Sequence, residues 1–112
     1  MQGTSFSTDK KIVCDYIEKA RDALPGMICR AYWFGSRSRG DGHPNSDYDL
    51  LLETSTVLKE SQRDALADIA VDLAAEHGSL LDVHFYSQRQ LEDEKIGRSP
   101  FVQVVHEEGI VL

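Results

Sequence analysis

Apolar residues recur at helical spacing in two long segments of the chain. They are Ile12, Val13, Tyr16, Ile17, Ala20 and Leu24 in the first segment, and Leu66, Ile69, Ala70, Leu73 and Ala74 in the second. Such a stripe predicts a helix that packs one face on a core. Thr8 is a suitable N-cap for the first helix, and Pro25 with Gly26 ends it. Gly78 is suited to end the second, over 61–77.

Three shorter segments, 29–34, 47–53 and 80–86, have the apolar or aromatic character typical of strands, and 110–112 is expected to add a short fourth. Ser87 with Gln90 forms a capping-box pattern, and Ser99 with Pro100 is a typical helix start. Two short helices are therefore expected near the C-terminal end. This order of elements indicates an α/β (α+β) fold, with one sheet covered by helices mainly on one face.

Composition and charge narrow the possible functions. The 112 residues favour a single domain, 1–112. Lys and Arg number 12 against 19 Asp and Glu, which gives a formal net charge of −7. Proteins that coat nucleic acid present a basic surface, so no direct nucleic-acid binding is expected. A negative field suits divalent cations or a basic partner.

The sequence shows no membrane or export signal. No run of about 18 apolar residues is present, and the N-terminus lacks a basic region followed by an apolar stretch. We therefore expect a cytoplasmic protein without membrane association. Cys14 and Cys29 have neither metal-ligand spacing nor a disulfide pattern, and we expect both to be small buried side chains.

Gly35 and Ser36 directly follow the first expected strand. If the next turn starts a helix, its backbone N–H groups and the helix dipole form a site for an anion, and the Ser36 hydroxyl can donate one more hydrogen bond. A plain turn is the alternative. The segment is neither a Walker A loop nor a dinucleotide fingerprint, because the lysine and the glycine spacing of those motifs are missing.

Asp47 and Asp49 open the second expected strand. Residues two apart on a strand face the same side, so both carboxylates emerge together. Two carboxylates about 4 Å apart repel by ~4 kcal/mol at an effective dielectric of about 20. Oxygen ligands of this kind suit Mg²⁺ or Mn²⁺. Solvated charges at a strand end are the alternative interpretation.

Asp82 lies within the apolar run 80–83 of the third expected strand. A carboxylate inside a buried strand is costly unless it is paired or bound to metal. If this strand lies beside the second, Asp82 can approach Asp47 and Asp49. Three carboxylates next to an anion site are the components of two-metal nucleotidyl transfer.

These residues resemble a known family. Gly35-Ser36, Asp47-Tyr48-Asp49 and the later Asp82 are similar in order and spacing to the DNA polymerase β-type nucleotidyltransferase superfamily. The run Gly-Ser-Arg-Ser-Arg-Gly followed by Ser46-Asp47-Tyr48-Asp49-Leu50 resembles its minimal nucleotidyltransferase (MNT) group, and the resemblance spans about residues 12–112. It implies the small mixed sheet of the polymerase β-type fold.

The resemblance also implies an activity. Many MNT proteins act as antitoxins that transfer AMP from ATP to tyrosine hydroxyls of a HEPN-type ribonuclease toxin. Carried over, Asp47 and Asp49 would bind both of two Mg²⁺ ions. Asp82 would complete the second metal site and act as base, and Gly35 and Ser36 would hold the β- and γ-phosphates.

Nearby polar residues have two interpretations each. We favour Arg37 as facing the phosphates and Arg39 as structural, although either can instead pair with Asp41 or Asp49. Ser46 either contacts a phosphate or shapes the loop. His84 shares a strand face with Asp82 by the two-residue period, so it either adjoins the site or is a structural histidine.

Two other functions stay open on the sequence alone. One is an antitoxin that neutralises its partner by contact, without catalysis. The other is a nucleotidyltransferase for a small hydroxylated molecule or a tRNA end. Because a chain of this length is too small to enclose both a triphosphate and an acceptor, we expect a partner chain or a second copy to complete the site.

Overall fold

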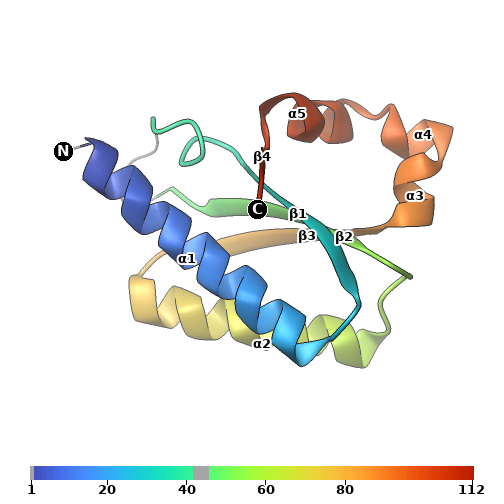
Figure 1. Ribbon diagram of the computed structural model, residues 1–112, viewed down its shortest axis with the longest axis horizontal. Coiled ribbons are helices and arrows are strands. Elements are labelled where there is room, and N and C mark those ends of the chain that lie inside the picture. Colours follow the sequence, from blue (N-terminus) through green and yellow to red (C-terminus); the bar gives the residue numbers. More distant parts are fainter. Residues whose placement is uncertain (1, 42–45) are drawn as a thin grey trace.

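The computed structural model describes residues 2–41 and 46–112. Its helices and strands follow one another along the chain as shown in Figure 1. They are α1 (Gln2–Ala23), β1 (Ile28–Phe34), β2 (Tyr48–Thr54), α2 (Glu60–His77), β3 (Leu81–Ser87), α3 (Gln88–Glu92), α4 (Glu94–Gly97), α5 (Pro100–Glu108) and β4 (Ile110–Val111).

The strands form one sheet in the order β3-β2-β1-β4. β1 pairs antiparallel with both β2 and β4, whereas β2 pairs in parallel with β3. The sheet is therefore mixed, as the resemblance implied, and β3 lies at one of its edges. This arrangement places the second and third expected strands side by side, which was the condition for bringing Asp82 near Asp49.

The two longest helices, α1 and α2, cover one face of the sheet, and the short helices α3 to α5 lie on the other side (Figure 1). On the first face, Leu50 and Leu52 of β2 join the main core. On the second, Leu51 packs with Tyr32 of β1 and Val105 of α5. Because strand side chains alternate in direction, three consecutive leucines are buried in two cores. The prediction of helices mainly on one face is confirmed.

Most helix boundaries follow the expected capping residues. Gly78 ends α2 in the left-handed region at φ +78°, Ser87 and Gln90 form the predicted capping box, and Ser99 caps α5 ahead of Pro100. The start of α1 was predicted wrongly: the helix begins at Gln2, so Thr8 lies inside it rather than at its N-cap. Among the described helices, none has the length and apolar character needed to cross a membrane.

The prediction of buried cysteines is wrong, because both thiols are exposed. Cys14 lies on the outer side of α1, between the buried positions Val13 and Tyr16. Cys29 lies where the register between β1 and β2 shifts, from Ile28 to Arg30.

Replacement of Leu50 tests the main core. Leu50 is fully buried, whereas Leu80, just before β3, is 65% exposed. We expect Leu50→Ala to lower the free energy of unfolding by about 2–5 kcal/mol, because it leaves a cavity, and Leu80→Ala to change it by less than about 0.5 kcal/mol. Urea denaturation followed by circular dichroism measures both. Equal losses in the two variants would contradict this assignment of the core.

Candidate active site

The loop after β1 is held by its own backbone. The Ser36 carbonyl accepts hydrogen bonds from the N–H groups of Arg39 (3.2 Å) and Asp41 (3.1 Å), and the Ser38 hydroxyl donates to the Gly35 carbonyl at 2.7 Å. Residues 36–40 form successive turns and not the start of a helix. An anion bound there would therefore rest on turn N–H groups, without the dipole of a longer helix.

Gly35 brings this loop against Asp49. Phe34, the preceding residue, is the register partner of Asp49 across β1 and β2. A Cβ atom at position 35 would collide with the Asp49 carboxylate, and the backbone there has φ +84°. Both the close approach and the left-handed conformation require glycine. The structure thus places the Gly35-Ser36 turn and Asp49 next to each other.

The three predicted carboxylates come from two adjacent strands. Asp47 directly precedes β2, Asp49 lies within it, and Asp82 of β3 is the parallel register partner of Asp49. Partners in parallel strands point to the same side, here the side of Leu51 and α5. The expectation that Asp82 lies in a buried strand is wrong, because β3 is an edge strand and the Asp82 side chain is 54% exposed.

The charges of this face act most strongly on Asp49, which is partly buried. Burial raises the pKa of the Asp49 carboxyl above its ordinary value of 3.8, and the negative charges of Asp82 and Asp47 raise it further. The positive charges of His84 and Arg39 act in the opposite direction on this pKa. The face therefore holds carboxylates that repel one another, and a bound cation would relieve the repulsion.

The donor set fits a hard divalent cation in chemical kind. Its members are carboxylate oxygens on one sheet face, the ligands that Mg²⁺ and Mn²⁺ prefer. Within 2–41 and 46–112, no three His, Cys, Asp or Glu side chains are gathered closely enough to hold a metal ion already. The carboxylates share a face without forming a closed cage.

His84 lies beside this set, as its strand position indicated. Its Nε2 atom is 3.4 Å from Asp82 Oδ2. The ring packs against Phe101 of α5, with centroids 4.8 Å apart, and near Phe34 of β1, at 6.2 Å. Sequence reasoning missed Phe101. The Ser99-Pro100 signal located the start of α5 but not the sheet face that the helix covers.

The structure corrects the prediction for Arg37. Its guanidinium is buried and pairs with Asp9 of α1 at 2.9 Å. Its Cζ atom lies 4.3 Å from the centre of the Tyr48 ring. Tyr48 belongs to the core beneath α1 and α2, so Arg37 lies on the opposite side of β2 from Asp49. It does not face a phosphate next to Asp49.

The structure shows contacts of the Arg39 side chain and of the Ser46 backbone carbonyl. Arg39 is about half exposed and pairs with Asp41 at 3.4 Å and with Glu108 at 3.1 Å, which matches the structural role favoured for it. The carbonyl of Ser46 accepts a hydrogen bond from Arg37 Nε at 2.7 Å. A phosphate contact of the Ser46 side chain stays a prediction.

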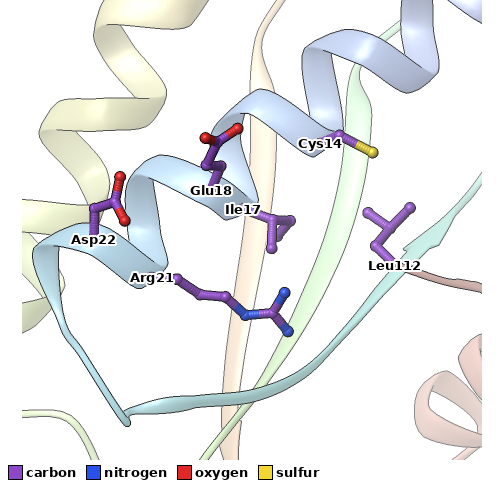
Figure 2. Close-up of a pocket in the computed structure, with 6 residues that line it drawn as sticks. All are labelled: Cys14, Ile17, Glu18, Arg21, Asp22 and Leu112. Carbon is purple, nitrogen blue, oxygen red and sulfur yellow. The ribbon is translucent and has the colours of Figure 1, made fainter.

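A pocket of about 320 Å³ lies away from the carboxylates. Five of its six lining residues belong to α1, and the sixth is Leu112 (Figure 2). Because α1 covers the face opposite to Asp49, this pocket does not adjoin the carboxylates. The candidate site is therefore the part of the α5 side of the sheet where Asp49 and Asp82 lie.

Comparisons with known proteins concern the domain as a whole. The family model of the nucleotidyltransferase domain matches residues 13–112. Among curated proteins, none matches the chain. A solved toxin–antitoxin complex with AMP-PNP is 29% identical, with a TM-score of 0.55 over 87% of this chain and 69% of that chain.

Two further solved structures are similar. A mutant of the toxin–antitoxin pair MntA-HpeT is 28% identical, with a TM-score of 0.54 over 86% of this chain and 67% of that chain. A minimal nucleotidyltransferase is 22% identical, with a TM-score of 0.56 over 93% of this chain and 95% of that chain. At that identity, the last likeness concerns the fold alone.

Removal of the charge of Asp49 tests the electrostatics of this face. A carboxyl whose pKa is raised by folding binds its proton more tightly in the folded state, so stability falls as pH rises from 3.8 through the folded pKa. We expect Asp49→Asn to raise Tm by a few degrees at pH 7, and the gain to shrink as pH falls toward 3.8. Calorimetry at several pH values measures this.

Asp68→Asn is the control, since Asp68 is exposed on α2 and the substitution removes the same formal charge. It is expected to leave Tm nearly unchanged. An Asp49→Asn variant that is less stable than the wild type at pH 7 would show that the carboxylate is not destabilised by its neighbours.

Proposed function

The chain belongs to the nucleotidyltransferase-domain family, and we propose that it transfers AMP from ATP to a hydroxyl group of a partner protein. The observation that carries this proposal is that Asp49 adjoins the Gly35-Ser36 turn and is the register partner of Asp82, while the charges of Asp47 and Asp82 act on it. The AMP-PNP bound in a similar toxin–antitoxin structure supports a nucleoside triphosphate as the donor.

Each residue of the face has a proposed role. Asp47 and Asp49 would bind two Mg²⁺ or Mn²⁺ ions, with Asp82 completing the second site. When bound, such ions neutralise phosphate charge and lower the pKa of an attacking hydroxyl. Gly35 and Ser36 would hold the β- and γ-phosphates, because the missing side chain of Gly35 lets the turn lie directly against Asp49. Ser46 would add a further nucleotide contact.

The proposed reaction is an in-line displacement at the α-phosphorus of ATP. The acceptor oxygen forms a bond to this phosphorus while the bond to the oxygen that bridges to the β-phosphate breaks, and pyrophosphate leaves. The acceptor proton passes to the Asp82 carboxylate. Asp82 suits this role because its side chain is 54% exposed at the edge strand, where an acceptor from another molecule can reach it.

The partner we propose is a HEPN-type ribonuclease toxin, modified on tyrosine, for which this chain is the antitoxin. Toxin–antitoxin complexes among the similar structures support this partner. The net charge of −7 is complementary to a basic protein that binds RNA. An acceptor bound over the exposed carboxylates would also exclude water from the reaction.

Replacement of the carboxylates tests the proposed activity. We expect the wild type to transfer label from α-labelled ATP to the cognate HEPN protein in the presence of Mg²⁺. Asp47→Asn, Asp49→Asn and Asp82→Asn should each lower the rate by more than about 100-fold, since even outer partners of metal ligands contribute 10–100-fold. Asp68→Asn should retain the wild-type rate.

Other outcomes would support the two rival functions. Absence of labelling by the wild type, together with neutralisation of the toxin by Asp47→Ala in cells, would favour an antitoxin that acts by contact alone. Label that appears in small metabolites, without any protein acceptor, would favour a small-molecule nucleotidyltransferase.

Two glycines allow a matched test of the phosphate-binding turn. Gly35 has φ +84° and Gly40 has φ +78°, but a Cβ atom at Gly40 would meet no atom of the described residues within 4 Å. Alanine at either position costs about 1–2 kcal/mol of backbone strain. Only Gly35→Ala also displaces the Asp49 carboxylate, so we expect only this variant to lower the transfer rate by more than about tenfold. Equal rates for both variants would contradict the role of Gly35.

A further inference from the structure

Arg37 is the one buried cationic side chain among the described residues, and it contacts three separate segments: α1, the start of β2 and the connection before β3. It is 7% exposed, and Asp9 is 9% exposed. Their side chains form an ion pair at 2.9 Å. A buried charge is tolerated only if its partners satisfy it. The contacts around Arg37 therefore form a defined network.

The Arg37 network consists of Asp9, Arg37, Ser46, Tyr48 and Ser79. Arg37 Nε donates to the Ser46 carbonyl at 2.7 Å, and Nη2 donates to the Ser79 hydroxyl at 3.1 Å. The guanidinium lies over the Tyr48 ring, and the Tyr48 hydroxyl donates to the same Asp9 oxygen at 3.0 Å. Burial, the hydrogen bond to Asp9 and the negative charge of Asp9 raise the pKa of Tyr48 to about 12, so the hydroxyl stays a donor.

Two of these segments carry the three carboxylates. Ser46 directly precedes Asp47, and Tyr48 lies between Asp47 and Asp49. Ser79 lies in the short connection before β3, three residues ahead of Asp82. Arg37 itself belongs to the turn that follows Gly35. The Arg37 guanidinium thus connects the turn after Gly35 to the residues at the starts of β2 and β3.

The network is separated from the reacting face. Arg37 and Tyr48 lie on the α1 side of β2, whereas Asp49 points to the α5 side. The charge of Arg37 is paired with Asp9, and it is His84 and Arg39, not Arg37, that lower the pKa of Asp49. Arg37 can therefore hold the strand starts in place without neutralising the carboxylates that would attract a cation.

We propose that Arg37, held by Asp9 and Tyr48, is a positioning residue that sets the relative placement of Asp47, Asp49 and Asp82 without contacting the nucleotide. This inference rests on the proposed function of those carboxylates. The planar guanidinium is suited to the task because it donates in fixed directions to several acceptors at once. A lysine would keep the charge opposite Asp9 but not the directions of the other bonds.

Arg37→Lys provides the main test, and Arg63→Lys on the exposed side of α2 is the matched control. The first readout is the affinity for Mn²⁺, measured by electron paramagnetic resonance titration of the folded chain. We expect Arg37→Lys to weaken Mn²⁺ binding by more than about fivefold and Arg63→Lys to leave it unchanged. An unchanged affinity in Arg37→Lys would overturn the proposal.

The second readout is the kinetics of AMP transfer to the cognate HEPN protein. A misplacement of about 1 Å can cost 10²-fold in rate, so we expect kcat to fall by more than about tenfold while KM for ATP changes by less than about threefold. A rise in KM with kcat unchanged would instead indicate a phosphate contact, and would overturn the positioning role. A loss of Tm without any change in kcat or Mn²⁺ affinity would do the same.

Tyr48→Phe is the second variant, used for both readouts if Arg37→Lys does not fold. It removes only the hydroxyl that donates to Asp9, and smaller changes in the same direction are expected. If the wild type binds Mn²⁺ but transfers no AMP, the proposed function fails while the Mn²⁺ affinity still decides the role of Arg37. A wild type that neither binds Mn²⁺ nor transfers AMP would overturn both the proposed function and the positioning role of Arg37.

Discussion

The main physical constraint on the candidate site is the repulsion among the carboxylates of Asp47, Asp49 and Asp82. Parallel pairing of β2 with β3 places Asp49 and Asp82 side by side, and Asp47 directly precedes β2, two residues before Asp49. The free energy of burying Leu50, Leu51 and Leu52 in two cores holds β2 in that register against the repulsion. The fold thus maintains a negative face that a divalent cation and a triphosphate would stabilise together.

The residues around this face leave it negatively charged and accessible to a second molecule. Glycine at position 35 lets the turn approach Asp49 closely. Arg37, one of the two arginines in the turn, is paired with Asp9 on the far side of β2. The edge position of β3 leaves Asp82 exposed to a second molecule. These features favour a reaction between a bound nucleotide and an acceptor supplied by another chain, as expected for a nucleotidyltransferase domain of this size.

Local patterns predicted most of the fold, and long-range contacts account for what was missed. The leucines of β2, Gly78 and the Ser87 capping box act over a few residues, and each was predicted. The partner of Arg37 lies 28 residues away in α1, and no spacing rule identifies it. The packing of Phe101 on His84 likewise depends on which face α5 covers. The adjacency of Asp49 and Asp82 required a strand order that the family resemblance, rather than periodicity, supplied.

A crystal structure with Mn²⁺ and AMP-PNP tests the central claim most directly, through the anomalous scattering of manganese. We predict anomalous peaks within about 2.5 Å of carboxylate oxygens of Asp47, Asp49 and Asp82, with the triphosphate beside Gly35 and Ser36. Nucleotide and manganese bound elsewhere, for example at the α1 pocket, with the three carboxylates free of metal, would contradict the account.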